Sequence, residues 1–193
     1  MSHQLSWSHY VELLSLEDIS KVEFYITICE QNNYSVRQLR EHIKNKEYER
    51  LDNNAKLKLV KKEELNVEDT IKNPIIINNK FHYEIISEKV LQKLILEDIP
   101  AFLKELGNSF SFISNEYPIK IGDRYNYIDL LLYNIEFNCY VVVELKITEL
   151  KKEYIGQIEV YMNYIDKNLK KLTQDKTIGI ILCKKDNKFI MEY

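Results

Sequence analysis

The fold of this chain is decided by two segments, Ile128-Asp129-Leu130-Leu131-Leu132-Tyr133-Asn134 and, after a short polar interval, Cys139-Tyr140-Val141-Val142-Val143-Glu144-Leu145-Lys146-Ile147. Both are apolar, aromatic and β-branched, which predicts two buried strands. Side chains alternate sides along a strand, so Glu144 and Lys146 point the same way. If the two strands pair as a hairpin, Asp129 can face them. Two carboxylates and one ammonium group then converge on an apolar sheet.

The three charges in these strands predict a metal site. A buried charge is unfavourable unless it is paired or binds a metal. Glu-x-Lys alone is common on protein surfaces, but here the pair ends a strongly apolar run. Gln157 and Tyr161 fall four residues apart in a segment that we expect to be a helix, so they share one face. Packing alone does not explain this combination, which is typical of a divalent-metal site with a lysine that positions the nucleophile.

The composition is that of a soluble globular protein. A length of 193 residues suits one or two small domains. Hydrophobic residues make up 45% and charged residues 30% of the chain, which are ordinary proportions. The formal net charge is −3, so the whole chain does not attract phosphate. Nucleic-acid binding therefore requires a local basic surface.

The cysteines, the histidines and the hydropathy exclude several classes of protein. Cys29, Cys139 and Cys183 form no C-x-x-C pair, and no spacing of Cys and His indicates zinc. We expect them to be reduced, buried thiols. No apolar run reaches about 18 residues, and no signal peptide is recognisable at the N-terminus. The sequence therefore predicts a cytoplasmic protein with no membrane partner.

Residues 1–72 are predicted to form a small, all-helical N-terminal domain. A helix over Leu16–Asn32 is followed by a turn, and Ser35 suits the N-cap of a second helix. This order is compatible with a helix-turn-helix-like arrangement. Three basic residues share one side of the second helix and are candidates for nucleic-acid binding: Arg37, Arg40 and Lys44. The alternative is an ordinary solvated helix face.

Residues 73–193 are predicted to form an α/β domain with a mixed sheet. Lys72-Asn73-Pro74 marks the boundary, because the residue before a proline avoids the helical conformation. A long helix from Ser87 toward Gly107 should kink or split at Pro100. The remaining elements expected are strands at Phe110–Ser114, Tyr117–Ile121 and Thr177–Cys183 and a helix at Glu153–Leu169. A strand, a helix and a strand in this order imply a right-handed parallel crossover.

The same residues, taken with their neighbours, resemble a known family. The pattern consists of Asp129, Glu144-Leu145-Lys146 and Gln157-x-x-x-Tyr161, together with Phe102-Leu103-Lys104-Glu105-Leu106-Gly107, Ile155-Gly156-Gln157 and Thr177-Ile178-Gly179-Ile180-Ile181-Leu182-Cys183. It resembles the YhcG-like nucleases of bacteria, within the PD-(D/E)XK superfamily. Leu5-Ser6-Trp7-Ser8-His9-Tyr10 and Asn33-Tyr34-Ser35-Val36-Arg37-Gln38-Leu39 resemble that family's helical N-terminal domain, so the resemblance spans nearly the whole chain.

The resemblance implies a fold and a cofactor. The fold would be a restriction-endonuclease-like mixed sheet flanked by helices and preceded by the small helical domain. The reaction would be hydrolysis of phosphodiester bonds in DNA. Asp129 and Glu144 would ligate Mg²⁺, with Mn²⁺ as the other candidate, and the backbone carbonyl of Leu145 would be a further ligand. Oxygen ligands suit magnesium.

The resemblance also implies roles for four further side chains. Lys146 would position or activate the attacking water and help to neutralise the scissile phosphate. Glu105 would contribute from the first helix, through water or directly. Gln157 would orient a phosphate or a water, and Tyr161 would support it.

Alternatives from other functional classes stay open at this point. One is a catalytically silent nucleic-acid-binding or assembly module on a nuclease fold, although the intact Asp129, Glu144 and Lys146 argue against it. Another is a homodimer formed through an apolar surface of the N-terminal helices, with Trp7, Leu13, Leu14 and Leu16 as the candidate residues.

Tyrosines lie on both sides of the candidate site. The chain has 14 of them, and those near the site are Tyr125, Tyr127, Tyr133 and Tyr140. Aromatic faces can stack on bases, but half-buried strand positions are the more common role for such residues.

Overall fold

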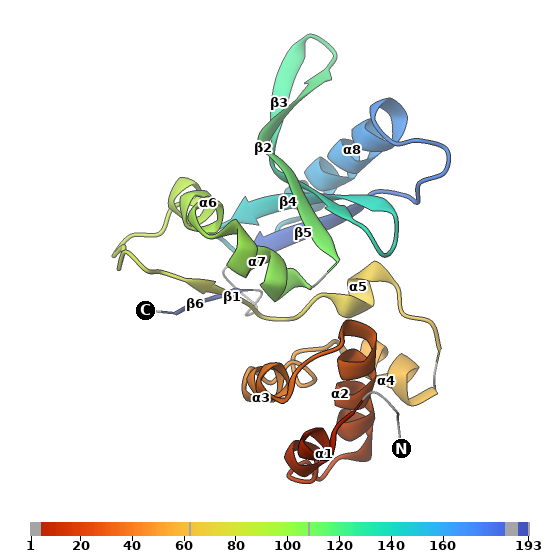
Figure 1. Cartoon of the computed structure of the whole chain (residues 1–193). Coiled ribbons are helices and arrows are strands. Elements are labelled where there is room, and N and C mark those ends of the chain that lie inside the picture. Colours follow the sequence, from red (N-terminus) through yellow and green to blue (C-terminus); the bar gives the residue numbers. More distant parts are fainter. Residues whose placement is uncertain (1–4, 62, 108, 184–188, 193) are drawn as a thin grey trace. The chain divides into compact units, whose positions relative to one another are not determined.

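The chain divides into two compact units, Met1–Lys72 and Asn73–Tyr193. The structure is a computed structural model and describes residues 5–61, 63–107, 109–183 and 189–192. Figure 1 shows the helices of the first unit and the mixed sheet of the second. No helix among the described residues has the length and the apolar character needed to span a bilayer.

The first unit is helical, as predicted. Its helices are α1 (Trp7–Leu13), α2 (Ile19–Asn32), α3 (Val36–Lys44), α4 (Asn53–Lys61) and α5 (Val67–Thr70). Asp18 caps the start of α2, because its carboxylate accepts from Ser20 N, and Asn33 caps the end in a left-handed conformation with φ 51°. The predicted cap at Ser35 is confirmed, because its hydroxyl and Gln38 form a capping box at the start of α3.

An apolar cluster and an ion-pair group hold this unit together. The cluster consists of Leu13, Tyr25, Cys29, Leu39 and Tyr48. In the turn that follows α3, the buried Glu47 has Oε2 2.7 Å from His42 Nδ1 and Oε1 2.7 Å from Lys72 Nζ. Burial alone would raise the pKa of Glu47, but these two partners outweigh it and lower the pKa. Glu47 is therefore held as an ionised carboxylate.

The second unit is a mixed α/β structure. Its elements are β1 (Ile75–Asn78), α6 (Glu88–Glu97), α7 (Ile99–Leu106), β2 (Phe110–Ile121), β3 (Arg124–Asn134), β4 (Cys139–Lys146), α8 (Lys152–Asn168), β5 (Ile178–Cys183) and β6 (Phe189–Glu192). Four strands form one sheet in the order β2-β3-β4-β5, and β1 and β6 form a separate parallel pair. Strands β3 and β4 are antiparallel, and β4 and β5 are parallel across α8. The predicted hairpin and crossover are confirmed.

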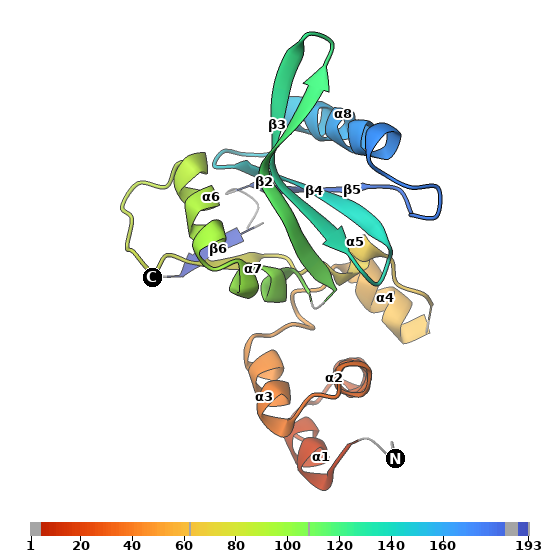
Figure 2. The ribbon, with the colours of Figure 1, turned by 45° about the horizontal axis from the view of Figure 1, so that its top comes forward.

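Both faces of the four-stranded sheet are covered. Helix α8 packs Ile158, Tyr161 and Ile165 against Leu131 and Val142. Figures 1 and 2 show α6 and α7 on the other side of the sheet from α8. The strand residues whose side chains alternate with Leu131 and Val142 are also buried, among them Leu130, Leu132, Val141, Val143 and Leu145. A strand covered on both faces reads as a continuous apolar run, which explains the sequence pattern.

One predicted boundary is confirmed and another is changed. The helix expected from Ser87 splits as predicted near Pro100: Asp98 caps α7 by accepting from Ala101 N, and Pro100 lies in the first turn of α7. The strands expected at Phe110–Ser114 and Tyr117–Ile121 are a single strand, β2. A register shift between Phe112 and Ser114 absorbs the irregularity without ending the pairing.

Strands β2 and β3 continue as a two-stranded ribbon well beyond the region where β3 pairs with β4. Strand β3 pairs with β4 only from Leu130 to Asn134, whereas it pairs with β2 as far as Arg124. Residues 115–129, which we call the outer hairpin, therefore form a two-stranded arm that projects past the sheet in both views (Figures 1 and 2). The candidate residue Asp129 lies at its base.

Candidate active site

Asp129 lies where β3 separates from β4. The last pair of the ladder is Leu130 with Val143, so the next backbone amide on this edge of β4 needs another acceptor. The Asp129 carboxylate supplies it, with Oδ2 accepting from Leu145 N at 2.8 Å. On the other side, Gln92 of α6 donates to the backbone carbonyl of Asp129 at 3.2 Å. These contacts fix Asp129 in the gap between the strands.

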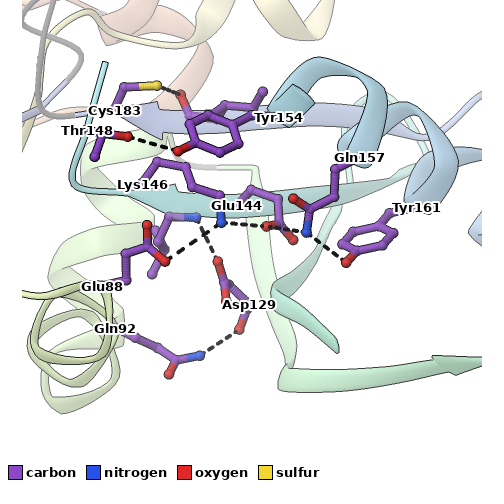
Figure 3. A network of polar contacts seen from close by, with 12 residues as sticks. Glu88, Gln92, Asp129, Glu144, Lys146, Thr148, Tyr154, Gln157, Tyr161 and Cys183 are labelled. Carbon is purple, nitrogen blue, oxygen red and sulfur yellow. Dashed lines mark hydrogen bonds and ion pairs between the residues drawn. The ribbon is translucent and has the colours of Figure 1, made fainter. Parts of the chain in front are cut away.

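Glu144 lies at the centre of a polar network (Figure 3). Only 2% of the residue is exposed. Its Oε2 accepts from Lys146 Nζ at 3.3 Å and from Gln157 Nε2 at 3.5 Å, and Gln157 also donates to the Tyr161 hydroxyl at 2.8 Å. Its Oε1 is buried and has no hydrogen-bond partner in the described part of the chain. A buried carboxylate oxygen without a donor is unfavourable unless a ligand completes it.

Lys146 connects this network to α6. Its Nζ lies 3.3 Å from Glu144 Oε2 and 3.9 Å from Glu88 Oε2, and 11% of its side chain is exposed. The ammonium group also lies over the ring of Tyr154, 5.4 Å from the ring centroid. Figure 3 shows Lys146 between the two glutamates. The lysine is thereby held with its charge directed toward the carboxylates.

The electrostatics of the network favour a cation. Burial raises the pKa of Glu144 to about 7, and the charge of Asp129 adds to this increase. Burial also raises the pKa of Asp129, and the charges of Glu88 and Glu116 add to this increase. The Leu145 amide and Lys146 lower the pKa, but by less. For Lys146, burial lowers the pKa, but Glu144, Glu88 and Asp129 outweigh it and raise the pKa. One ammonium group does not fully compensate the carboxylates around it.

These residues fit a divalent cation bound by oxygen. Within the described residues, no group of three or more His, Cys, Asp and Glu side chains is placed to hold a metal. The two carboxylates that repel each other, Asp129 and Glu144, and the unsatisfied Glu144 Oε1 are donors that a cation would complete. Magnesium keeps several waters and commonly needs only one or two carboxylates. The chemistry of the donors therefore suits Mg²⁺ or Mn²⁺ better than zinc.

The structure brings together five of the predicted catalytic side chains: Asp129, Glu144, Lys146, Gln157 and Tyr161. The sixth candidate, Glu105, makes a different contact. Glu105 lies on α7, and its carboxylate accepts from the backbone amide of Ile76 at 2.9 Å. The acidic residue that reaches the network from a helix is Glu88, at the first position of α6.

The sequence carries a signal for the contribution of α6, although the predicted site did not include this helix face. Glu88 and Gln92 are four residues apart, directly after the N-cap Ser87, so they share one helix face. Both reach β3 and β4, through Lys146 and through the Asp129 carbonyl. Glu116 was also missed, and its charge acts on Asp129 from β2.

The three basic candidates on α3 are exposed, and two of them face carboxylates. Arg40 Nη2 lies 2.6 Å from Glu12 Oε1, and Arg37 Nε lies 3.9 Å from Glu41 Oε1. Lys44 is exposed in the last turn of the helix. Part of the positive charge on this face is therefore compensated within the unit.

The apolar residues considered for dimerisation are divided between surface and core. Trp7 is 70% exposed and Leu14 is 77% exposed, whereas Leu13 is 3% exposed and belongs to the apolar cluster of the first unit. Only part of the set is therefore available to a partner.

Comparison with known proteins agrees with this arrangement. The family model of the YhcG PDDEXK nuclease domain matches residues 68–193, and that of the DUF1016 N-terminal domain matches residues 1–50. "Putative nuclease YhcG" of Escherichia coli (strain K12) is 27% identical over 188 residues, which cover 94% of this chain and 50% of that protein. The chain thus spans about half the length of this curated relative.

Among solved structures, a repair endonuclease from Pyrococcus abyssi is similar at 22% identity and a TM-score of 0.39. The similarity covers 53% of this chain and 39% of that one. A TM-score of this size does not establish a shared fold.

Proposed function

Because this chain belongs to the YhcG PDDEXK nuclease domain family, we propose that it is a metal-dependent nuclease that hydrolyses phosphodiester bonds in DNA. The observation that carries the proposal is the buried pair Asp129 and Glu144 beside Lys146, with one carboxylate oxygen left unsatisfied. Mg²⁺, or Mn²⁺ in its place, is the proposed cofactor. Asp129, Glu144 and the backbone carbonyl of Leu145 are its proposed ligands.

The residues of the site divide the chemical work between them. A bound divalent cation would lower the pKa of a water and stabilise negative charge on the phosphoryl oxygens. Lys146 keeps its proton, because the neighbouring carboxylates raise its pKa. Its ammonium group can therefore attract the scissile phosphate and stabilise charge that develops in the transition state. Asp129 uses Oδ2 for Leu145 N, an anchor that holds the carboxylate group at the point of strand separation.

Gln157 and Tyr161 have a positioning role in this proposal. The Gln157 amide donates to both Glu144 and Tyr161, so the tyrosine orients the amide and the amide orients the carboxylate. Glu88 has a similar role toward Lys146. Glu105, whose Oε1 accepts from Ile76 N, would contribute from α7 through a water.

The direct test is cleavage of a panel of labelled nucleic acids by the purified chain. The panel contains duplex, single-stranded and branched DNA and single-stranded RNA, each with Mg²⁺, with Mn²⁺ and with EDTA. We expect cleavage of DNA with either metal and none with EDTA. Binding without cleavage of any member would instead indicate a silent nucleic-acid-binding module, and EDTA-resistant cleavage would contradict the metal site.

We further propose that α3 contacts the DNA backbone through Arg37, Arg40 and Lys44. Each phosphate contact that is lost should lower the slope of log affinity against log salt by about 0.9. Replacing all three by glutamine should lower it by less than about 2.7, because Glu12 and Glu41 already compensate part of the charge. Base preference should change little, since phosphate contacts carry no sequence information.

This prediction is measured by fluorescence anisotropy across a salt series, in a Glu144→Gln background so that the DNA stays intact. The control has the same net charge and replaces three exposed lysines of the second unit by glutamine: Lys167, Lys171 and Lys176. An equal loss of slope in both variants would show a general charge effect. Unchanged DNA binding with a smaller oligomer would instead assign α3 to assembly.

A further inference from the structure

We propose that the outer hairpin binds a single-stranded segment of nucleic acid next to the candidate site, with Tyr125 and Tyr127 stacking on unpaired bases and Lys120 contacting the backbone. This inference rests on the proposed function and names the substrate class of the same site. Three observations support it: the exposure of the tyrosines, the register of the hairpin and the position of Asp129.

The four tyrosines near the site have two different environments. Tyr133 and Tyr140 are half-buried and pack edge to face, with ring centroids 5.2 Å apart. The Tyr133 hydroxyl also bonds to Asn138 and accepts from Gln174. Tyr125 and Tyr127, in contrast, are 64% and 56% exposed. The fold accounts for the first pair and gives no packing role to the second.

The outer hairpin has one buried and one exposed face. Ile119 and Ile128 are fully buried in the cluster under α8, with Tyr117 packed against it. On the opposite face, Lys120 is paired with Tyr125 and Pro118 with Tyr127, and all four are exposed. In the described part of the chain, neither tyrosine has a ring contact or a hydrogen bond, and Lys120 has no ion pair. These three side chains are available to a ligand.

The exposed face leads directly to the candidate site. Tyr127 and Tyr125 precede Asp129 on β3 by two and four residues. At about 3.4 Å per residue, Tyr127 and Tyr125 lie roughly 7 and 14 Å along the strand from Asp129. A strand of nucleic acid with its scissile phosphate at Asp129 would therefore place neighbouring bases over the two rings.

Base stacking on protein side chains requires bases whose faces are open. In a duplex these faces are covered by neighbouring base pairs, whereas unpaired bases can stack on tyrosine. Charge gives the outer hairpin no attraction for a duplex, because Lys120 and Arg124 are outnumbered by its three acidic residues, Glu116, Asp123 and Asp129. Aromatic rings without a net positive charge favour single strands over a duplex recognised by its phosphates.

The experiment measures binding in the Glu144→Gln background, using fluorescein-labelled oligothymidylate, oligouridylate and a DNA duplex. The double variant Tyr125→Ala/Tyr127→Ala should bind the single strands about 5- to 100-fold more weakly per tyrosine lost, with duplex binding nearly unchanged. Tyr125→Phe/Tyr127→Phe keeps both rings and should retain binding. Phe81→Ala removes another aromatic side chain of this unit, 54% exposed, and should have no effect.

Two further readouts keep the outcome decisive. Lys120→Gln should lower the salt slope for a single strand by about 0.7 if it contacts one phosphate. A strand with 2-aminopurine should show fluorescence quenching with the phenylalanine variant and not with the alanine variant. Comparison of oligothymidylate with oligouridylate tells whether DNA or RNA is preferred.

The outcomes separate this inference from the proposed function. Single-strand binding that depends on both rings, in a chain that never cleaves, would support the inference and overturn the proposed nuclease activity. Metal-dependent cleavage with single-strand binding unchanged in the alanine variant would overturn the inference and leave the activity in place. Equal losses for duplex and single strand would also overturn it, as would a loss of binding in the phenylalanine variant.

Discussion

Glu144→Gln is expected to abolish metal-dependent cleavage and, at the same time, to stabilise the protein in the absence of metal. The loss of activity should be at least on the order of 10²- to 10³-fold, the effect of removing one preorganised electrostatic contact from an active site. The gain in stability has a separate cause. Burial and Asp129 raise the pKa of Glu144 to about 7, so the ionised carboxylate is less stable in the folded chain than in the unfolded one.

The sign of the pH dependence follows from this shift. Between the ordinary value of 4.5 and about 7, the folded chain binds more protons at Glu144 than the unfolded chain does. The contribution of this group to the free energy of unfolding therefore falls as the pH rises through that window. The full difference is roughly 3 kcal/mol above pH 7. Glutamine has no charge to bury, so the variant should lose this part of the pH dependence.

Thermal melts with EDTA and with millimolar Mg²⁺, at pH 5 and pH 8, check both parts of this prediction. Mg²⁺ should raise the melting temperature of the wild type by mass action and have little effect on Glu144→Gln. Glu159→Gln removes an exposed carboxylate from α8 and is the matched control. Near-wild-type cleavage by Glu144→Gln would contradict the assigned site. An equal Mg²⁺-induced shift of the melting temperature in the wild type and in Glu144→Gln would contradict Glu144 as a ligand.

Lys146→Met should also lose cleavage by on the order of 10²- to 10³-fold, but its effect on stability should have the opposite sign. The ammonium group offsets Glu144, Glu88 and Asp129, and its removal leaves the buried Asp129 and Glu144 without this positive charge. The metal-free variant should therefore be less stable, by up to about 3 kcal/mol. Mg²⁺ should restore more stability to this variant than to the wild type, because the cation replaces the missing charge.

This comparison is made by chemical denaturation with and without Mg²⁺, together with the cleavage assay. Lys89→Met, at an exposed position of α6, is the matched control. If Lys146→Met were as stable as the wild type in EDTA, Lys146 would not be compensating the carboxylates. If the variant retained cleavage, its proposed role toward the phosphate would be wrong.

The sheet could be predicted because its strands are covered on both faces. Continuous apolar runs such as Cys139–Lys146 are typical of buried strands. Charged residues inside such a run are unusual, which identifies them as candidates for a site. Once β3 and β4 are taken to pair as a hairpin, strand alternation accounts for the convergence of Asp129 with Glu144 and Lys146.

The helical contribution to the site could not be predicted in the same way. A helix from Ser87 toward Gly107, kinked or split at Pro100, was expected, and Glu105 was its predicted contribution to the site. The cap at Asp98 divides that helix into α6 and α7, and only the packing of α6 against β4 decides that Glu88 reaches Lys146. The exposure of Tyr125 and Tyr127 was equally hidden, because strand alternation does not tell which face of an arm is covered.

The ion-pair group around Glu47 has a practical consequence for dividing the chain. Lys72 is the last residue of the first unit and supplies one of the two cationic partners of a buried carboxylate. A fragment that stops at the end of α5, at Thr70, would lack this ammonium group although it contains every helix of the unit. Its Glu47 would keep only His42, whose charge depends on protonation. Fragments prepared to study the helical unit alone should therefore include Lys72, and a shorter one should unfold more readily.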